Sequence, residues 1–154
     1  MDVLYTVGYE GARLNDFVEQ LKELHIQLVV DVREKAWSRK PGFSKTSLNT
    51  ALARRGIKYI HVPELGSPSS IRRQLHEDGD YRRFFAEYRR YLLNHSDVAD
   101  GLVEDLENET ACLMCFERDP NTCHRKVIAE YLTSIAGLMK EVQHIDGCPP
   151  GMGA

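Results

Sequence analysis

Short apolar runs alternate with amphipathic stretches along most of the chain. The apolar runs, several of them rich in β-branched residues, cover 3–7, 28–32, 57–61, 111–116 and 142–145. Between the first two, Leu14, Phe17 and Leu21 recur at steps of three and four residues, the spacing of an amphipathic helix. Buried strands that alternate with helices predict βαβ units and a parallel sheet covered on both faces.

The middle of the chain departs from this alternation, because residues 68–108 show helical patterns only. The clearest is the stripe formed by Tyr81, Phe84, Phe85 and Tyr88, which is typical of a helix face packed in a core. We therefore predict a doubly wound α/β fold: a mostly parallel sheet of about five strands flanked by helices, with an inserted helical pair between strands three and four. We expect residues 1–146 to form a single domain and 147–154 a flexible C-terminal tail.

Composition bears on the partners and the cellular location that we expect for this domain. The 154 residues include 20 Lys and Arg against 23 Asp and Glu, so the net charge is −3 and there is no overall basic field for nucleic acid. No apolar stretch approaches the roughly 18 residues of a membrane helix, and the first residues lack the basic start of a secretory signal. The four cysteines are too few and too unevenly placed for a disulfide framework, so we expect reduced thiols, a cytoplasmic location and no membrane partner.

Polar groups follow several of the predicted strands. Ligands of a doubly wound sheet bind outside the carboxyl ends of its strands, so the candidate ligand-binding residues are Gly8, Tyr9, Glu10, Asp31, Arg33, Ser44, Lys45, His61, Cys115, Arg118 and Arg125. Gly8 and Gly11 either let backbone N–H groups approach an anion or form a tight turn before a helix. Asp31 and Arg33 share one face of a strand, so Arg33 either pairs with Asp31 or holds an anionic ligand.

The loop that follows the fourth strand, and the start of the next helix, form the sharpest feature. We expect Asn121 or Thr122 to cap that helix, which would place Cys123, His124 and Arg125 in its first turn. There the positive helix end and two neighbouring bases would favour a thiolate and attract anions. Cys123 is therefore the candidate nucleophile or redox thiol; the alternative is that it packs as a small apolar residue.

The cysteines also raise the question of a metal site. Cys112 and Cys115 spell C-x-x-C, but an odd spacing of three puts them on opposite faces of a strand, which argues against a zinc knuckle. An assembled site stays open as an alternative, built from Cys115, Cys123 and His124 with His61 or His144. We assign no metal ligand from the sequence.

The helical middle carries arginine pairs among acidic residues. The pairs are Arg72 and Arg73, Arg82 and Arg83, and Arg89 and Arg90, with Glu77, Asp78, Asp80 and Glu87 between or beside them. This mixture predicts a solvated, salt-bridged face. The alternative is a local basic surface for a phosphate backbone.

A set of short motifs falls mostly at the predicted strand ends. They are Thr6 to Gly11, Asp31 to Arg33, Gly42 to Lys45, Gly56 to Tyr59, Leu65-Gly66, Cys115 to Glu117, Cys123 to Arg125 and Ala129 to Leu132. Together, over about Tyr5 to Ile145, they resemble the family called domain of unknown function 488. The resemblance implies a compact α/β domain and no established activity. Family members often have proline at the place of Ala36 and a second glycine at that of Ser67.

Three functions are compatible with these residues. The leading hypothesis is an enzyme, or enzyme-like domain, that binds a small anionic or phosphorylated ligand, such as a nucleotide, at the carboxyl edge of the sheet. Its catalytic groups would be Cys123 with Glu117 or His124 as acid or base. The first alternative is a non-catalytic nucleic-acid-binding or regulatory module, and the second is a Cys/His metal-binding protein. The residues point to no particular cofactor or oligomeric state.

Overall fold

A five-stranded sheet forms the centre of the computed structural model, which describes residues 2–148. Its strands are β1 (Val3–Gly8), β2 (Leu28–Asp31), β3 (Lys58–His61), β4 (Ala111–Cys115) and β5 (Glu141–Ile145). They lie in the order β3-β2-β4-β1-β5, and every neighbouring pair is parallel. In the register, Gly8 lies opposite Cys115 and Asp31 opposite His61, so the carboxyl ends of these strands meet at one edge.

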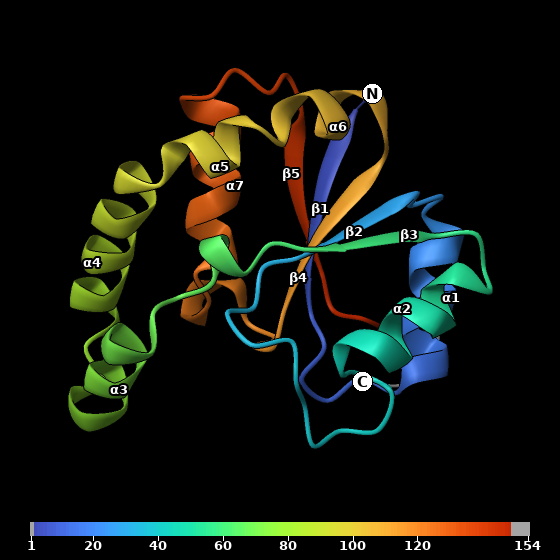
Figure 1. Ribbon diagram of the computed structural model, residues 1–154, viewed down its shortest axis with the longest axis horizontal. Helices are drawn as coiled ribbons and strands as arrows, with labels where there is room; N and C mark the ends of the chain where they lie inside the picture. Colours follow the sequence, from blue (N-terminus) through green and yellow to red (C-terminus); the bar gives the residue numbers. More distant parts are fainter. Residues whose placement is uncertain (1, 149–154) are drawn as a thin grey trace.

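Helices cover both faces of this sheet (Figure 1). On one face lie α1 (Leu14–Glu23) and α2 (Lys45–Ala53); on the other lie α4 (Tyr81–Asn94), α5 (Ser96–Asp100), α6 (Val103–Asn108) and α7 (Arg125–Ser134). Two 3₁₀ turns, Pro63–Leu65 and Pro120–Thr122, interrupt the loops. The predicted doubly wound α/β fold is confirmed.

The sheet separates two hydrophobic cores. Val30 and Leu113 point into the core shared with α4 to α7, whereas Val29 and Met114 point into the core shared with α1 and α2. This alternation follows from the pleat of a strand whose two faces are both buried. It also places Cys112 and Cys115 in different cores, as their odd spacing predicted.

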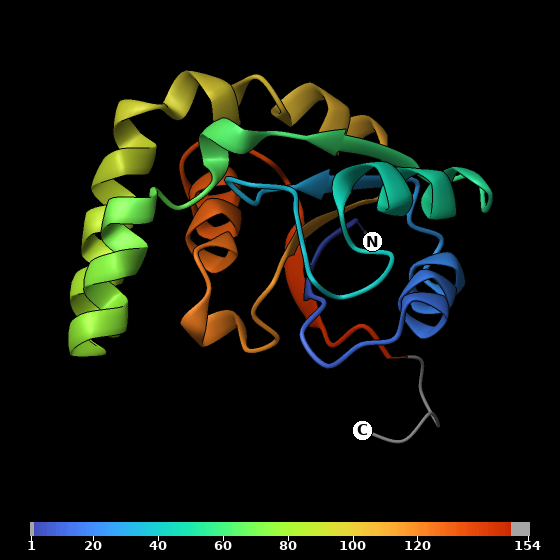
Figure 2. The same cartoon turned by 60° about the horizontal axis from the view of Figure 1, so that its bottom comes forward.

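Between residues 68 and 108 the chain forms helices joined by short breaks and no strand, as its pattern indicated. Helix α3 (Ser69–Asp78) buries none of its residues in the core and packs beside α4, and the two helices project together from one side of the sheet (Figure 2). Helix α4 buries Phe84, Tyr88 and Leu92, and the Tyr88 hydroxyl donates a hydrogen bond of 2.5 Å to the Leu65 carbonyl. Within the inserted pair, α4 therefore provides the contact with the hydrophobic core.

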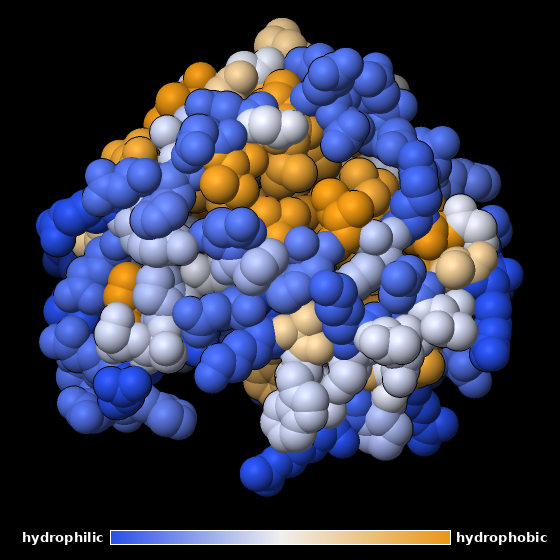
Figure 3. All heavy atoms as spheres, viewed as in Figure 1, coloured by the Kyte–Doolittle hydropathy of each residue, from blue (hydrophilic) through white to orange (hydrophobic). Residues whose placement is uncertain are grey.

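Surface polarity differs between the two ends of the sheet. In the view of Figure 1, apolar atoms gather between α6 and β3, while hydrophilic residues predominate lower down, where β1 and β4 end (Figure 3). Within residues 2–148, no helix combines the length and apolar character needed to cross a membrane. The tail expected over 147–154 lies, from residue 149 on, outside the described part of the chain.

Candidate functional site

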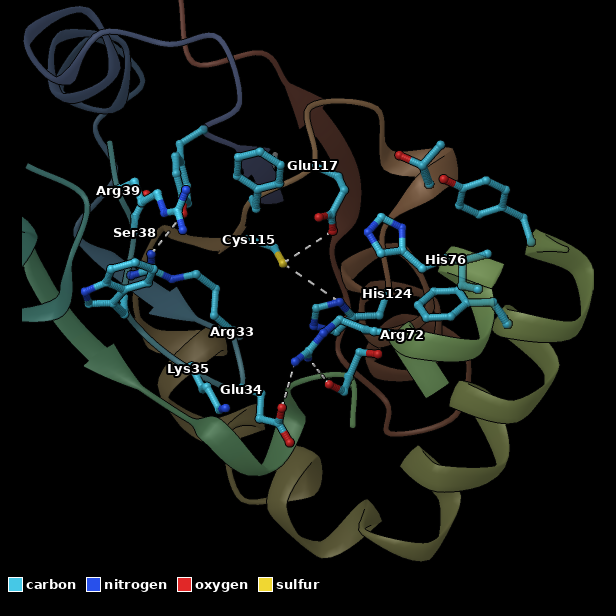
Figure 4. A pocket seen from close by; sticks show the side chains of 18 residues that line it. Arg33, Glu34, Lys35, Ser38, Arg39, Arg72, His76, Cys115, Glu117 and His124 are labelled. Carbon is cyan, nitrogen blue, oxygen red and sulfur yellow. Dashed lines mark hydrogen bonds and ion pairs between the residues drawn. The ribbon is translucent and has the colours of Figure 1, made fainter. Parts of the chain in front are cut away.

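A cavity of about 580 Å³ opens at the carboxyl edge of the sheet. The loops after β1, β2 and β4 form its floor and one wall, and α3 and the start of α4 form the opposite wall (Figure 4). Its lining residues are Tyr9, Arg33, Glu34, Lys35, Trp37, Ser38, Arg39, Ser67, Arg72, Leu75, His76, Tyr81, Phe84, Cys115, Phe116, Glu117, Thr122 and His124. This is the edge at which a doubly wound sheet binds its ligands.

Four reactive side chains converge at the floor of this cavity. The Cys115 thiol lies 3.9 Å from a Glu117 carboxylate oxygen and 3.8 Å from Nδ1 of His124. The Cys123 thiol lies 3.8 Å from the same Nδ1 atom, and one donor atom from each of the four residues lies within 4.8 Å of the others. Cys115 lines the cavity, whereas Cys123 is fully buried.

The prediction that Cys123 and His124 occupy the first turn of a helix is wrong. Asp119, not Asn121 or Thr122, supplies the capping carboxylate, and it caps the short 3₁₀ turn Pro120–Thr122. Cys123 then adopts an extended conformation, and α7 begins only at Arg125. Cys123 therefore reaches the cluster from an extended linker, and its environment is set by Cys115 and His124.

Gly8 and Arg125 hold the backbone that carries Glu117. A Cβ atom on Gly8 would lie 1.7 Å from the Glu117 carbonyl oxygen, so only glycine permits this approach. The fully buried Arg125 guanidinium donates to the carbonyls of Glu117 and Arg118 and to Thr6 Oγ1. The structure thus places Gly8 and Arg125 beneath the site, and neither residue lines the cavity.

Arg33 and Asp31 form a buried ion pair. Arg33 Nε and Nη2 donate to the two Asp31 carboxylate oxygens over 2.9 and 2.7 Å, and Tyr59 donates its hydroxyl to the same carboxylate. Arg33 Nη1 donates to Phe43 O and to the Tyr9 hydroxyl. Burial opposes the charge of Arg33, but the hydrogen bonds and negative charge of Asp31 raise its pKa further. Arg33 lines the cavity with its charge already compensated.

The four residues Cys115, Glu117, Cys123 and His124, called the floor cluster below, shift one another's pKa values. Burial raises the pKa of Glu117 to about 7, and the nearby Cys123 adds to this. Burial alone would also raise the pKa of Cys123, but a hydrogen bond from Cys115 and the charge of His124 outweigh it and hold that pKa well below its usual range. The hydrogen bond to Cys123 and burial raise the pKa of Cys115. Burial lowers the pKa of His124, yet the charge of Cys123 raises it overall.

Cationic and aromatic side chains surround the mouth of the cavity. Lys35, Arg39, Arg72 and His76 line it, and Arg72 pairs with Glu34 at 2.9 Å (Figure 4). Among residues 2–148, the large aromatic side chains with substantial exposure are Trp37 (67%), Phe116 (43%) and Tyr81 (41%), and each of them lines this cavity. Exposed aromatic groups collected at one opening mark a binding surface for an apolar or flat ligand.

Most of the other predicted ligand-binding residues form hydrogen bonds or an ion pair with the loops around the cavity. His61 and Ser44 hydrogen-bond to Arg33 O and to the Ser38 backbone. Glu10 accepts from the Arg118 backbone, and the Arg118 side chain pairs with Asp146 at 3.6 Å. Lys45 is exposed at the start of α2 and does not line the cavity. Tyr9 does line it, stacked on Phe43 with ring centroids 4.6 Å apart.

Several lining residues were not selected from the sequence, above all Trp37, Ser67 and Tyr81. Trp37 is the single tryptophan of the chain and stands in the loop after a strand, a signal that could have identified it. Tyr81 belonged to a stripe interpreted as core, but it lies at the exposed start of α4. The arginine-rich helices form salt bridges as predicted, with Arg83 pairing with Asp78 and Glu87.

Comparison with known proteins places this chain in a family. No significant match occurs among the curated proteins or among the solved structures. The model of one protein family, described as a domain of unknown function, matches residues 13–132, a range that holds β2, β3, β4 and the whole floor cluster. The chain belongs to the family Domain of unknown function DUF488.

Proposed function

We propose that this chain is an enzyme that acts on a small anionic ligand with a flat, nucleobase-like part, bound in the cavity at the carboxyl edge of the sheet. One observation carries the proposal: a thiol, a carboxyl and an imidazole lie together at the floor of a cavity whose mouth is basic and aromatic. Convergent reactive groups in a concave site are a usual mark of an active site.

The mouth supports the choice of ligand. Lys35 and Arg39 offer cationic donors suited to phosphate or carboxylate oxygens. Trp37 and Phe116 offer exposed ring faces on which a base can stack. Among the described residues, the buried Ser67 Oγ has no hydrogen-bond partner, and it lines this cavity, so it is available to a polar group of the ligand.

The floor supports a revised assignment of the catalytic groups. Cys115, rather than the fully buried Cys123, is the thiol that borders the cavity. We assign contact with the reacting group of the ligand to Cys115 and to Glu117, which borders the cavity beside it. His124, with Nδ1 directed at both thiols, completes the catalytic set.

The nucleic-acid alternative has weaker support. Arg72 and Arg83, from two of the arginine pairs, are engaged with acidic side chains, so they do not offer uncompensated charge to a phosphate backbone.

We also propose a cytoplasmic location, which suits the unoxidised thiols of Cys112, Cys115 and Cys123.

Ligand binding can be tested with the single tryptophan as the reporter. Because Trp37 stands at the mouth, adenosine 5′-monophosphate should change its fluorescence saturably, and ribose 5-phosphate, which lacks the base, should bind more weakly. Lys35→Gln and Arg39→Gln should each weaken binding about 10-fold, whereas Arg54→Gln, an exposed arginine outside the cavity lining, should not. No saturable response to either compound at millimolar concentration would overturn the proposed ligand class.

The thiol assignment can be tested by alkylation with iodoacetate in a Cys148→Ser background. In alkaline solution, where the raised pKa of Cys115 no longer keeps its thiol protonated, we expect modification at Cys115, slowed by adenosine 5′-monophosphate, with the buried Cys112 as an internal control. Modification of Cys123 in preference to Cys115, located by peptide mass spectrometry, would contradict the assignment.

A further inference from the structure

We infer that the floor cluster is a binding site for a thiophilic divalent cation such as Zn²⁺, with Cys115, Cys123 and His124 as ligands and Glu117 at the fourth position. The four residues bring two thiols, one imidazole nitrogen and one carboxylate oxygen within 4.8 Å of one another. Sulfur, nitrogen and oxygen donors in this combination are the ones that Zn²⁺ takes in proteins.

The separations between donor atoms fit a tetrahedral ion. With Zn–S and Zn–N bonds of about 2.3 and 2.0 Å, the donor atoms of a tetrahedral site stand about 3.5–3.8 Å apart. Each thiol lies 3.8 Å from His124 Nδ1, and the Cys115 thiol lies 3.9 Å from the Glu117 carboxylate. These three separations are therefore close to those of a tetrahedral site, and the remaining donor atoms lie within 4.8 Å of one another.

The imidazole of His124 is oriented as a metal ligand requires. Its Nε2 atom lies 2.8 Å from the Val32 carbonyl oxygen, and because a carbonyl can only accept, Nε2 carries the hydrogen. In the neutral ring, Nδ1 then presents its lone pair to the two thiols. A backbone carbonyl that fixes the other ring nitrogen is the common outer partner of a metal-bound histidine.

The balance of charge around the cluster also favours a cation. Three groups that can become anionic, Cys115, Cys123 and Glu117, share one largely buried place. The neighbouring guanidinium groups are directed elsewhere: Arg125 donates to Thr6 and to backbone carbonyls, and Arg33 pairs with Asp31. A bound cation would compensate converging anionic donors in this site of low polarity.

The position of the ion would give it a part in the proposed reaction. Cys123 and His124 approach from the buried side, whereas Glu117 is partly exposed and borders the cavity. Glu117 is then the ligand on the cavity side, and an anionic group of the substrate would reach the ion by displacing its carboxylate, since catalytic zinc sites keep one position for water or substrate. This role rests on the proposed function; the binding of the ion does not.

The experiment is a titration of the reduced, chelator-treated protein with Co²⁺ and then Zn²⁺. We expect one Co²⁺ per chain, a thiolate-to-cobalt absorption band with the visible bands of tetrahedral cobalt, and displacement by one equivalent of Zn²⁺. Cys123→Ser and His124→Gln should abolish these bands, and Glu117→Gln should weaken Zn²⁺ binding at least 10-fold. Cys148→Ser and His144→Gln, which change donors outside the cluster, should leave the titration unchanged.

Folding of each variant is checked by far-ultraviolet circular dichroism, and Cys115→Ser provides a second ligand substitution if Cys123→Ser does not fold. Absence of stoichiometric binding, or bands that persist in the folded ligand variants, would overturn the metal site. So would a stable Cys115–Cys123 disulfide in protein purified under air without reductant, together with no metal uptake after reduction. Titration of Trp37 fluorescence with adenosine 5′-monophosphate, without metal, tests the proposed ligand separately.

Discussion

Gly8 and Glu117 touch through their main chains: a Cβ atom on Gly8 would lie 1.7 Å from the Glu117 carbonyl oxygen and 2.3 Å from its carbonyl carbon. The contact joins the end of β1 to the loop after β4, the two segments that approach each other because β1 and β4 are paired. The contact places the Glu117 carboxyl within the floor cluster. The geometry of the cluster therefore depends on Gly8, a residue that does not line the cavity.

Gly8→Ala should destabilise the protein by about 3 kcal/mol, toward the upper end of overpacking costs because the atom met is backbone. It should also lower the affinity for Zn²⁺, since the Glu117 loop must move. Urea denaturation and the cobalt titration measure the two effects. Gly101→Ala is the control, because Gly101 has an α-helical conformation and its Cβ would meet nothing closer than 3.3 Å. Unchanged stability in Gly8→Ala would contradict the close contact.

Arg125→Met should cost about 3 kcal/mol of unfolding free energy. The methionine keeps most of the buried length but leaves the carbonyls of Glu117 and Arg118 without their donors, and each buried unpaired group costs about 1–3 kcal/mol. The neighbouring substitution Lys126→Met removes an exposed contact with Asn121 and should change stability by less than about 0.5 kcal/mol. Equal effects of the two substitutions in urea denaturation would refute a positioning role for Arg125.

Protonation of His144 should lower the free energy of unfolding in mild acid. Thr6 Oγ1 accepts from Arg125 Nε and hydrogen-bonds to His144 Nδ1, so the single hydroxyl hydrogen goes to an unprotonated His144. Burial and the charges of Arg125 and Lys126 lower the pKa of His144 below its ordinary value. The unfolded chain therefore binds the proton more tightly, and this contribution to stability is lost as the pH falls below about 6.5.

The His144→Gln variant isolates that contribution. The stability difference between wild type and variant should be larger at pH 8 than at pH 5, when both are measured by urea denaturation. An NMR titration of the His144 ring should also give a pKa below about 6.5. A stability difference that is independent of pH would show that His144 protonates equally well in the folded and unfolded chains.

Ser67→Ala should weaken ligand binding without weakening the fold. In the described part of the protein its buried hydroxyl has no partner, so its removal should leave stability unchanged or slightly higher. Loss of a hydrogen bond to the ligand should reduce the affinity for adenosine 5′-monophosphate about 3- to 10-fold. Ser69→Ala, at the exposed start of α3, is the matched control in calorimetry. Equal affinity in the two variants would remove Ser67 from the binding site.

Much of the fold could be predicted from local patterns. The apolar runs identified the positions of all five described strands, and the continuous helical pattern between β3 and β4 was confirmed. Local patterns were less informative at element boundaries. The helix after β4 begins later than its capping signals indicated, because Asp119 caps a separate 3₁₀ turn and Cys123 is extended.

Strand-end reasoning led to the edge of the sheet at which the cavity opens, but not to the details of the cavity. Strand-end reasoning brought together Tyr9, Arg33, Cys115, Glu117 and His124, which all line the cavity. It could not separate Cys115, which borders the cavity, from the fully buried Cys123, because one ends the same apolar strand that the other follows. Nor could it show that the wall opposite the floor comes from α3 and α4, which are distant in sequence.

The sequence by itself determined the βαβ order of the elements, the opposite faces of Cys112 and Cys115, and the set of polar groups at the strand ends. These depend on spacing along one strand or helix, which the backbone repeats of 2 and 3.6 residues control. Only the tertiary structure decided that Cys115, Glu117, Cys123 and His124 share one point, and that Arg33 and Arg125 are occupied by partners within the protein. The approach of Gly8 to Glu117 and the hydrogen bond from Arg125 to Thr6, which fix the loop of this cluster, join segments more than 100 residues apart, and no local pattern specifies them.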